Sequence, residues 1–241
     1  PNCDISMTYH EDGTLRCHYC GHTMRLPKTC PKCGSKYLAG LGIGTEKACE
    51  LVSAEFPGAG ILRMDMDTTA KKGSHEKILQ AFSDHEADIL LGTQMIVKGH
   101  DFKNVTLVGI LVADRSLYAP TYRAAEKTFQ LLTQAAGRAG RGSNPGDVVI
   151  QTYRPEHYAV KSAAEQDYQA FYDREIHFRL GLGYPPVKRL MSILLEHPVD
   201  KRADELIEAA AAIVRERVGA RGTVTGPSPD NIGRINNLYR R

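Results

Sequence analysis

The chain has 241 residues, of which 42% are hydrophobic and 24% are charged, and its formal net charge is +3. This composition is ordinary for a folded globular protein, and the weak positive charge is compatible with a nucleic-acid partner without establishing one. No apolar run approaches the roughly 20 residues of a membrane span, so we expect no membrane partner.

Cysteines are concentrated at the start of the chain. Five of the six lie within the first 33 residues, namely Cys3, Cys17, Cys20, Cys30 and Cys33. Two C-x-x-C pairs, each followed by glycine, are typical of zinc knuckles in a reducing cytoplasm, where disulfides are rare. Four thiolates from these pairs would form a closed, structural zinc site. Cys3 is then a free thiol or the second half of another pair, and Cys49 is expected to be buried and inert.

Residues 1–38 are polar, and a β-hairpin is predicted across Asp12–Gly13. From about Leu41, strands and helices alternate. The predicted strands cover residues 61–67, 87–93, 104–114 and 147–153, and the predicted helices lie within residues 42–56, 74–84, 119–137 and 155–182. This alternation predicts a doubly wound α/β unit with right-handed crossovers over residues 39–155.

Individual positions follow from the same patterns. Thr45 and Ser74 are the expected N-caps of the first two helices. Side chains expected on the inward face of the first helix are Ala48, Leu51, Val52 and Phe56. The apolar strand at 104–114 is of the kind found in the middle of a parallel sheet.

A new unit is predicted after Pro185–Pro186. It contains a strand at 188–197, a helix at 200–219, and a strand with a loop at 222–241. We therefore divide the chain into residues 1–38, 39–185 and 186–241, the last being a small, partial α+β domain.

The stretch "QLLTQAAGRAGRG" at 130–142 places Gln134, Arg138 and Arg141 among glycines and alanines. Guanidinium groups held in this way stabilise charge on a γ-phosphate during phosphoryl transfer, and they can be supplied from another domain. The alternative is a solvated basic turn. No G-x-x-x-x-G-K-[ST] loop occurs in the chain, so we expect these arginines to reach a nucleotide that is bound elsewhere.

The stretch "ILLGTQMIVKGHDF" at 89–102 is a strand that opens into a loop. Thr93 and Lys98 could contact phosphate there, although an ordinary turn explains the pattern equally well. His100 carries little weight as a base because no paired nucleophile is visible. Asp114 and the "MDMD" at 64–67 match a Walker B strand, but any apolar strand that ends in an acid does so, and we discount both.

These stretches together resemble a known family. "GTQMIVKGHDFKNVTLVGIL" is similar to motif V of superfamily 2 helicases, and "QLLTQAAGRAGR" is similar to motif VI. Together with the cysteine segment, "GIGTEK" and "RMDMDTT", they resemble the primosomal replication-restart helicases, the PriA (primosomal protein N′) family, over essentially the whole chain. The resemblance implies an interior or C-terminal fragment made of the second RecA-like lobe, with a doubly wound parallel sheet, a small zinc-binding insertion and the start of a C-terminal domain.

The resemblance also implies a function for the full-length protein. Such proteins are ATP-driven DNA translocases that unwind 3′ to 5′, recognise abandoned forks and recruit helicase-loading proteins. The expected partners are forked or single-stranded DNA, primosome proteins and single-stranded-DNA-binding protein, and the expected form is a monomer in the bacterial cytoplasm, associated with the nucleoid. The cofactor is ATP with Mg²⁺. The chain alone should be inactive because it has no Walker A loop. The competing hypothesis is a non-enzymatic zinc-ribbon module that binds nucleic acid or protein on a RecA-like scaffold.

Residue roles follow from the same resemblance. Arg138 and Arg141 would contact the γ-phosphate, with Arg141 as the arginine finger and Gln134 near the same site. Asp101, together with Gly99, would lie at the nucleotide edge of motif V, near the ribose. The residues placed towards the DNA strand are Thr93 and Lys98.

The resemblance implies two interleaved zinc ions in the full-length protein. Cys3, Cys17 and Cys20 would be three ligands of one ion, and Cys30 and Cys33 half of the other set, because the first three cysteines of the family pattern are missing here. Three outcomes remain open: the two C-x-x-C pairs form one local site, a histidine completes a site, or the segment is poor in metal. The candidate histidines are His10, His18 and His22.

Overall fold

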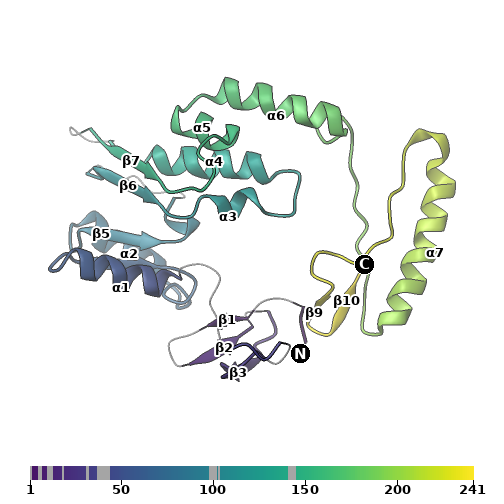
Figure 1. The fold of residues 1–241 in the computed structure, drawn as a ribbon, viewed down its shortest axis with the longest axis horizontal. Coiled ribbons are helices and arrows are strands. Elements are labelled where there is room, and N and C mark those ends of the chain that lie inside the picture. Colours follow the sequence, from purple (N-terminus) through teal and green to yellow (C-terminus); the bar gives the residue numbers. More distant parts are fainter. Residues whose placement is uncertain are drawn as a thin grey trace. The chain divides into compact units, whose positions relative to one another are not determined.

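The computed structural model describes residues 2–4, 7–9, 13–17, 19–30, 33–36, 44–97, 102, 104–140 and 145–241. The chain separates into two units, one formed by Pro1–Leu41 together with Met191–Arg241 and the other by Gly42–Leu190. Figure 1 shows their elements along the chain. Among the described residues, no helix is long and apolar enough to cross a membrane.

The cysteine-rich part of the first unit is a three-stranded antiparallel sheet. Strand β1 (Thr8–Tyr9) pairs with β2 (Thr14–Arg16), and β2 pairs with β3 (Thr23–Arg25). The hairpin predicted near the start of the chain is confirmed by the β1–β2 pairing. Residues 10–12 of its turn lie outside the described residues.

The C-terminal part of the first unit joins one helix to a second small sheet. Strand β8 (Glu196–His197), helix α7 (Asp200–Val218), the 3₁₀ turn η2 (Gly219–Arg221), β9 (Arg234–Ile235) and β10 (Leu238–Arg240) follow in order, and the sheet order is β8-β10-β9. Helix α7 confirms the prediction. The strand predicted at 188–197 is wrong over most of its length, because only its last two residues pair with another strand.

The first half of the second unit has two parallel strands. Helix α1 (Thr45–Glu55) precedes β4 (Ile61–Met64), and α2 (Ser74–Ser83) precedes β5 (Ile89–Gly92), which pairs with β4. The 3₁₀ turn η1 (Gln94–Val97) follows.

Both predicted N-caps in this half are wrong by one residue. Gly44 and Gly73 occupy the cap positions, and Gly73 has φ of 82°, which favours glycine. Thr45 is instead the first helical residue, and its hydroxyl donates to Asp65 Oδ2 at 2.6 Å. The inward face of α1 is also narrower than predicted.

On that face, Ala48 is buried and Val52 is half-buried, one helical turn apart. Leu51 and Phe56, also expected to face inward, are 51% and 55% exposed. Cys49, expected to be buried, is half-buried.

The second half of this unit contains the main core. Strand β6 (Leu107–Ile110) leads through α3 (Asp114–Leu117) to α4 (Ala124–Ala136), and β7 (Asp147–Ile150) pairs with β6 in parallel. Helix α4 packs against one face of these strands, and α5 (Tyr158–Ala164) and α6 (Tyr168–Leu182) pack on α4 to complete the core (Figure 1). The predicted single helical stretch at 155–182 is broken where Gln166 has φ of 53° and Asp167 caps α6 through Ala170 N–H.

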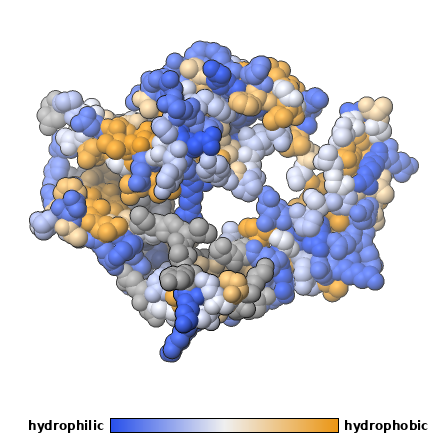
Figure 2. All heavy atoms as spheres, in the orientation of Figure 1, coloured by the Kyte–Doolittle hydropathy of each residue, from blue (hydrophilic) through white to orange (hydrophobic). Residues whose placement is uncertain are grey.

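The strand predicted for the middle of a sheet has one partner among the described residues. The parallel pairs β4–β5 and β6–β7 form separate two-stranded sheets there. On the face of β6–β7 away from the helices, Leu107 is 62% exposed and Val149 is 60% exposed. Figure 2 shows apolar side chains gathered over these strands. A single, continuous doubly wound sheet is therefore not seen in the described part of the chain.

Candidate metal centre and nucleotide-facing turn

The two C-x-x-C pairs adopt the same local fold. In the first, Gly21 N–H donates to Cys17 O at 2.9 Å, and Cys17 N–H donates to His22 O at 2.8 Å. In the second, Gly34 N–H donates to Cys30 O and Cys30 N–H donates to Ser35 O, both at 2.8 Å. The glycines have φ of 70° and 71°. The knuckles expected from the glycine after each pair are thus formed.

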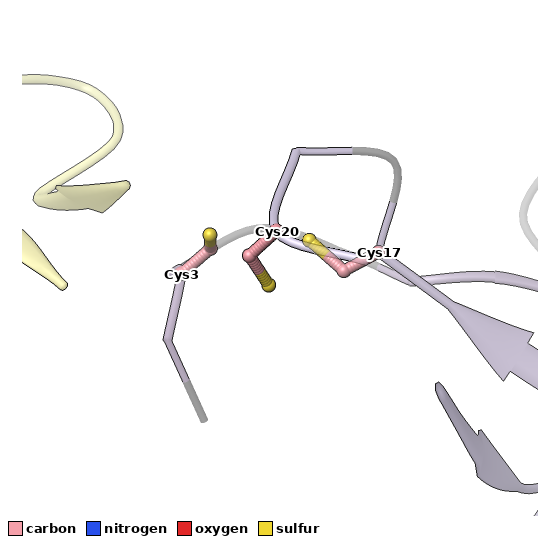
Figure 3. A group of neighbouring side chains, drawn as sticks. All are labelled: Cys3, Cys17 and Cys20. Carbon is pink, nitrogen blue, oxygen red and sulfur yellow. The ribbon is translucent and has the colours of Figure 1, made fainter. Parts of the chain in front are cut away.

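Three thiols converge. The Sγ atoms of Cys3, Cys17 and Cys20 all lie within 4.8 Å of one another, and Figure 3 shows the three side chains close together. Sulfur ligands about 2.3 Å from one zinc ion lie about 3.8 Å apart in a tetrahedral site, so small adjustments would let the three thiols bind the same ion. The set fits zinc both in chemistry and in spacing.

This grouping favours one of the sequence-based alternatives. It is the set implied by the family resemblance. Among the described residues, Cys30 and Cys33 do not join the group, so the arrangement does not favour a single site made from both C-x-x-C pairs. His22 does not join it either, and His10 and His18 lie outside the described residues.

The local environment prepares one of these thiols to bind metal. Backbone N–H groups of Cys20 and Tyr19 lower the pKa of the Cys17 thiol to about 7. The N–H of Asn236 acts in the same direction on Cys3, but burial and the neighbouring Cys20 and Cys17 thiols outweigh it and raise the pKa of Cys3. Metal binding replaces these protons, since the thiolate is the ligand.

The arginine-bearing turn follows α4 directly. Gly137 N–H donates to Thr133 O at 3.0 Å, and Arg138 N–H donates to Ala135 O at 3.0 Å, so the chain tightens as the helix ends. Arg138 is half-buried. The side chain of Gln134 is exposed on the last turn of α4. Arg141 lies outside the described residues.

Two glycines fix the end of this turn. Gly140 has φ of 71°, and its N–H donates to Val105 O at 3.0 Å, just before β6. A Cβ atom added to Gly146 would lie 2.2 Å from Gly140 N, which is far inside van der Waals contact. Glycine is therefore required at positions 140 and 146 because the two backbones pack directly against each other. This packing anchors the described backbone on both sides of residues 141–144.

Of the site residues predicted in motif V, Thr93 lies within the described part of the chain. It follows β5, is exposed, and its N–H donates to Met64 O at 3.4 Å. A Cβ on Gly92 would lie 2.3 Å from the same Met64 carbonyl, so glycine is needed where β5 opens into the loop. The predicted site residues Lys98, Gly99 and Asp101, and also His100, lie outside the described residues.

Comparisons with known proteins agree with this arrangement. A family model described as the PriA DNA helicase Cys-rich region (CRR) domain matches residues 1–25, and one described as the helicase conserved C-terminal domain matches residues 44–143. The replication restart protein PriA of Bacillus subtilis (strain 168) is 49% identical over 241 residues, covering 100% of this chain. The chain belongs to the PriA family.

Other PriA proteins match over the same extent. The replication restart protein PriA of Synechocystis sp. is 42% identical over 245 residues, and that of Chlamydia pneumoniae is 40% identical over 243 residues, each covering 100% of this chain. The chain spans 30% of the length of the Bacillus subtilis and Synechocystis relatives and 32% of that of the Chlamydia pneumoniae relative. The family assignment identifies the second unit as a RecA-like helicase lobe and the cysteine segment as the PriA zinc ribbon.

Two acids that were discounted as Walker B matches in the sequence are buried in this PriA lobe and organise its turns. Asp65 accepts hydrogen bonds from the N–H groups of Asp67 and Thr68 and from the Thr45 hydroxyl. Burial opposes ionisation, but these bonds and Arg63 keep the pKa of Asp65 below its usual value. The available signal for this turn was an acid directly after a strand, with two threonines three and four residues later.

The second carboxylate, Asp114, joins the ends of β6 and β7. Thr152 Oγ1 donates to it at 2.9 Å and Tyr153 N–H at 3.0 Å. Both groups keep its pKa low despite burial. These acids, which resembled Walker B residues in sequence, organise turns of the lobe.

A buried ionic cluster connects α4 to α6. The Arg179 guanidinium contacts Glu175 Oε1 at 2.6 Å and Glu126 Oε2 at 2.8 Å, and it donates to Pro185 O at 3.0 Å. Tyr158 donates to Glu175 at 2.6 Å. Burial and the Glu175 carboxylate strongly raise the pKa of the Tyr158 hydroxyl.

A cavity of about 390 Å³ lies beside this cluster, with Gln134 in its lining. The ion pair between Arg179 and Glu126 connects α4, the helix that carries motif VI, to α6. The i, i+4 spacing of Glu175 and Arg179 was the local sequence signal for the cluster, but it did not reveal Glu126 as the third member.

Proposed function

We propose that this chain forms the second lobe of an ATP-driven DNA helicase that unwinds DNA 3′ to 5′ and acts in replication restart at stalled forks and in primosome assembly. The observation that carries the proposal is the anchored turn after α4, in which Gly140 is bonded to Val105 and packed on Gly146. Val105 and Gly140 lie within the region that matches the helicase C-terminal model, and Gly146 follows three residues after its end. Such anchoring suits a loop that must deliver an arginine to a fixed point.

In this proposal the lobe supplies positively charged side chains to the γ-phosphate, and a first lobe binds the rest of the triphosphate. Arg141 acts as the arginine finger on the γ-phosphate of ATP·Mg²⁺ bound by a first lobe, and Arg138 and Gln134 act beside it. Asp101 and Gly99 contact the nucleotide near the ribose. The planar guanidinium suits this role because it offers several donors in a fixed geometry and stays charged.

The same proposal extends to DNA and to the sheet. Thr93 and Lys98 face the DNA strand, where motif V couples loss of the γ-phosphate to stepping. In the complete lobe, the β4–β5 and β6–β7 pairs belong to one doubly wound parallel sheet. Further proposed partners are helicase-loading primosome proteins and single-stranded-DNA-binding protein, with the protein acting as a monomer.

We also propose that Cys3, Cys17 and Cys20 bind one structural zinc ion, and that Cys30 and Cys33 belong to a second. The convergence of the first three thiols supports this assignment. Zinc bound by thiolates alone in a closed site stabilises the fold and takes no part in catalysis. Metal analysis of the full-length protein, with Cys17→Ser as the loss variant, tests it. Unchanged zinc content in that variant would overturn the assignment.

The helicase proposal is tested in the full-length protein with Arg141→Ala. We expect DNA-stimulated ATPase to fall at least about 10³-fold, because an arginine finger contributes that much to phosphoryl transfer. Arg174→Ala, at an exposed position on α6, is the matched control and should be without effect. An unchanged rate in Arg141→Ala would overturn the finger. ATPase above background from the 241-residue chain alone would overturn the two-lobe arrangement, and a full-length protein that binds DNA without any ATPase would favour the zinc-ribbon binding module.

A further inference from the structure

The C-terminal hairpin ends at the candidate metal centre. Strands β9 and β10 pair with Leu238 opposite Ile235, which leaves Asn236 and Asn237 as a two-residue turn. Both asparagines have positive φ, 50° and 65°. This is the type I′ geometry that matches the twist of a hairpin, and asparagine tolerates it better than most residues.

Backbone groups of the hairpin hold the segment that carries Cys3. Asn237 N–H donates to Asn2 O at 3.0 Å, and Asp4 N–H donates to Arg234 O at 2.9 Å. Between these two bonds, Asn236 N–H donates to Cys3 Sγ at 3.3 Å. The first metal-ligand thiol is thus placed by a turn that lies 233 residues further along the chain.

The other two thiols are placed locally. Cys17 and Cys20 belong to the knuckle between β2 and β3, whose bonds all lie within residues 17–22. The three thiols therefore come from two structural sources, the knuckle and the C-terminal hairpin. An ion bound by all three joins these sources.

The hairpin is in turn fixed to the rest of the C-terminal segment. Arg240 contacts Glu196 at 3.0 Å in β8 and Asp230 at 2.6 Å. Arg241 contacts Asp204 at 2.5 Å and also Asp200, in the first turns of α7. These ion pairs therefore connect the Asn236–Asn237 turn, through β10, to α7.

We propose that the zinc ion, through Cys3, links residues 191–241 to the cysteine-rich sheet, and that the Asn236 N–H is the group that orients this ligand. The proposal rests on zinc binding by Cys3, Cys17 and Cys20. A hydrogen bond to a metal-bound thiolate is charge-assisted, and groups that orient metal ligands commonly change metal affinity 10- to 100-fold. By linkage, the factor by which docking of the hairpin raises zinc affinity is also the factor by which zinc favours docking.

Three variants of the full-length protein test the role of the turn. Asn236→Val places a β-branched side chain at positive φ and should displace the N–H, whereas Asn236→Gly keeps both the conformation and the donor. Asn231→Val makes the same change at an exposed asparagine before β9. With Zn²⁺ and a competing chromophoric chelator, we expect about 10-fold weaker binding for Asn236→Val. The other two variants should bind like the wild type.

Amide hydrogen exchange measures the reverse direction. Removing zinc from the wild type should speed exchange in residues 234–241, and Cys3→Ser in the presence of zinc should do the same, so the proposal can be tested even where Asn236→Val fails to fold. Unchanged exchange in both cases would overturn the link. Wild-type affinity in a folded Asn236→Val would overturn the role of the N–H. A wild type that binds no zinc would instead overturn the metal assignment under the proposed function.

Discussion

The cysteine knuckles and the arginine turn both require glycine, but for different physical reasons. A Cβ added to Gly21 or Gly34 would have nothing within 4 Å, so these positions need glycine only for their positive φ. Gly140 and Gly146 lie in direct backbone contact. The knuckle is thus specified by residues next to each other in sequence, whereas the arginine turn is specified by packing.

The knuckles and the second unit also differ in the sequence separation of the residues that their hydrogen bonds and ion pairs join. The bonds that form a knuckle join residues no more than five apart. In the second unit, the Arg179–Glu126 pair joins residues 53 apart, and Gly140 is held by a carbonyl 35 residues earlier. We therefore expect substitutions in the second unit to cost more stability and to act over longer distances than those in the knuckles.

The largest effect is expected for Arg179→Met. Removing the guanidinium leaves the buried Glu175 carboxylate without its cation and leaves Glu126 with the exposed Arg123, and breaking a buried pair in this way costs about 3 kcal/mol or more. Urea unfolding of the 241-residue chain, followed by circular dichroism, measures the loss. Arg174→Met on the exposed side of α6 is the control. A loss no larger than that of the control would mean that the cluster does not hold α4 to α6.

Gly146→Ala should have the next largest effect. The added methyl cannot fit beside Gly140 N, so β7 and the arginine turn must separate, and overpacking of this kind typically costs about 2 kcal/mol. In the full-length protein we expect DNA-stimulated ATPase to fall together with stability. Gly181→Ala, in open space on α6, should stabilise the chain slightly, since alanine is the better helix former. Full ATPase in Gly146→Ala would show that the turn tolerates displacement.

Gly21→Ala should have a smaller and more local effect. An alanine at φ of 70° costs about 1 kcal/mol, and nothing nearby obstructs its methyl group. We expect zinc affinity to fall about fivefold, which corresponds to that free energy. Gly21→Asn should lose less zinc affinity, because asparagine tolerates this conformation. The free energy of unfolding of the second unit should not change in either variant. If Gly21→Ala lowered the free energy of unfolding as much as Gly146→Ala does, glycines needed for their φ could not be distinguished from glycines needed for packing.

Sequence patterns predicted the elements whose causes are local and failed where a distant partner decides. The knuckles, the first hairpin and α7 follow from neighbouring residues. Thr45 is a good N-cap by type, but its hydroxyl is taken by Asp65, twenty residues later. The apolar residues at 188–195 suggest a strand, yet a strand needs a paired neighbour, and of these residues Leu195 alone exchanges backbone bonds, with Arg241.

The candidate sites follow the same rule. The C-x-x-C spacing predicted two knuckles but could not show which thiols share an ion, because Cys3 is brought to Cys17 and Cys20 by a hairpin at the other end of the chain. The G-R-x-G-R pattern marked the arginine turn, whereas its packing on Gly146 depends on contacts that no local pattern encodes.

The smallest predicted effect concerns pH. His157 Nδ1 accepts Ala159 N–H at 3.2 Å and caps α5, and burial, assisted by Arg154, lowers the pKa of this histidine. Below its ordinary value of about 6.5 the unfolded chain binds a proton that the folded chain excludes, so this histidine makes stability fall from pH 7 towards pH 5.

His157→Asn separates the cap from the titration, because asparagine is a good N-cap without a titratable group. We expect the free energy of unfolding to depend less on pH between 7 and 5 in this variant than in the wild type. Asp65 and Glu126 do not interfere, since their lowered pKa values place their contribution below about pH 4.5. Equal slopes in the two proteins would show that His157 is protonated as readily in the folded chain as in the unfolded one. A protonated imidazole cannot accept the Ala159 N–H, so another group would then have to cap α5 at low pH.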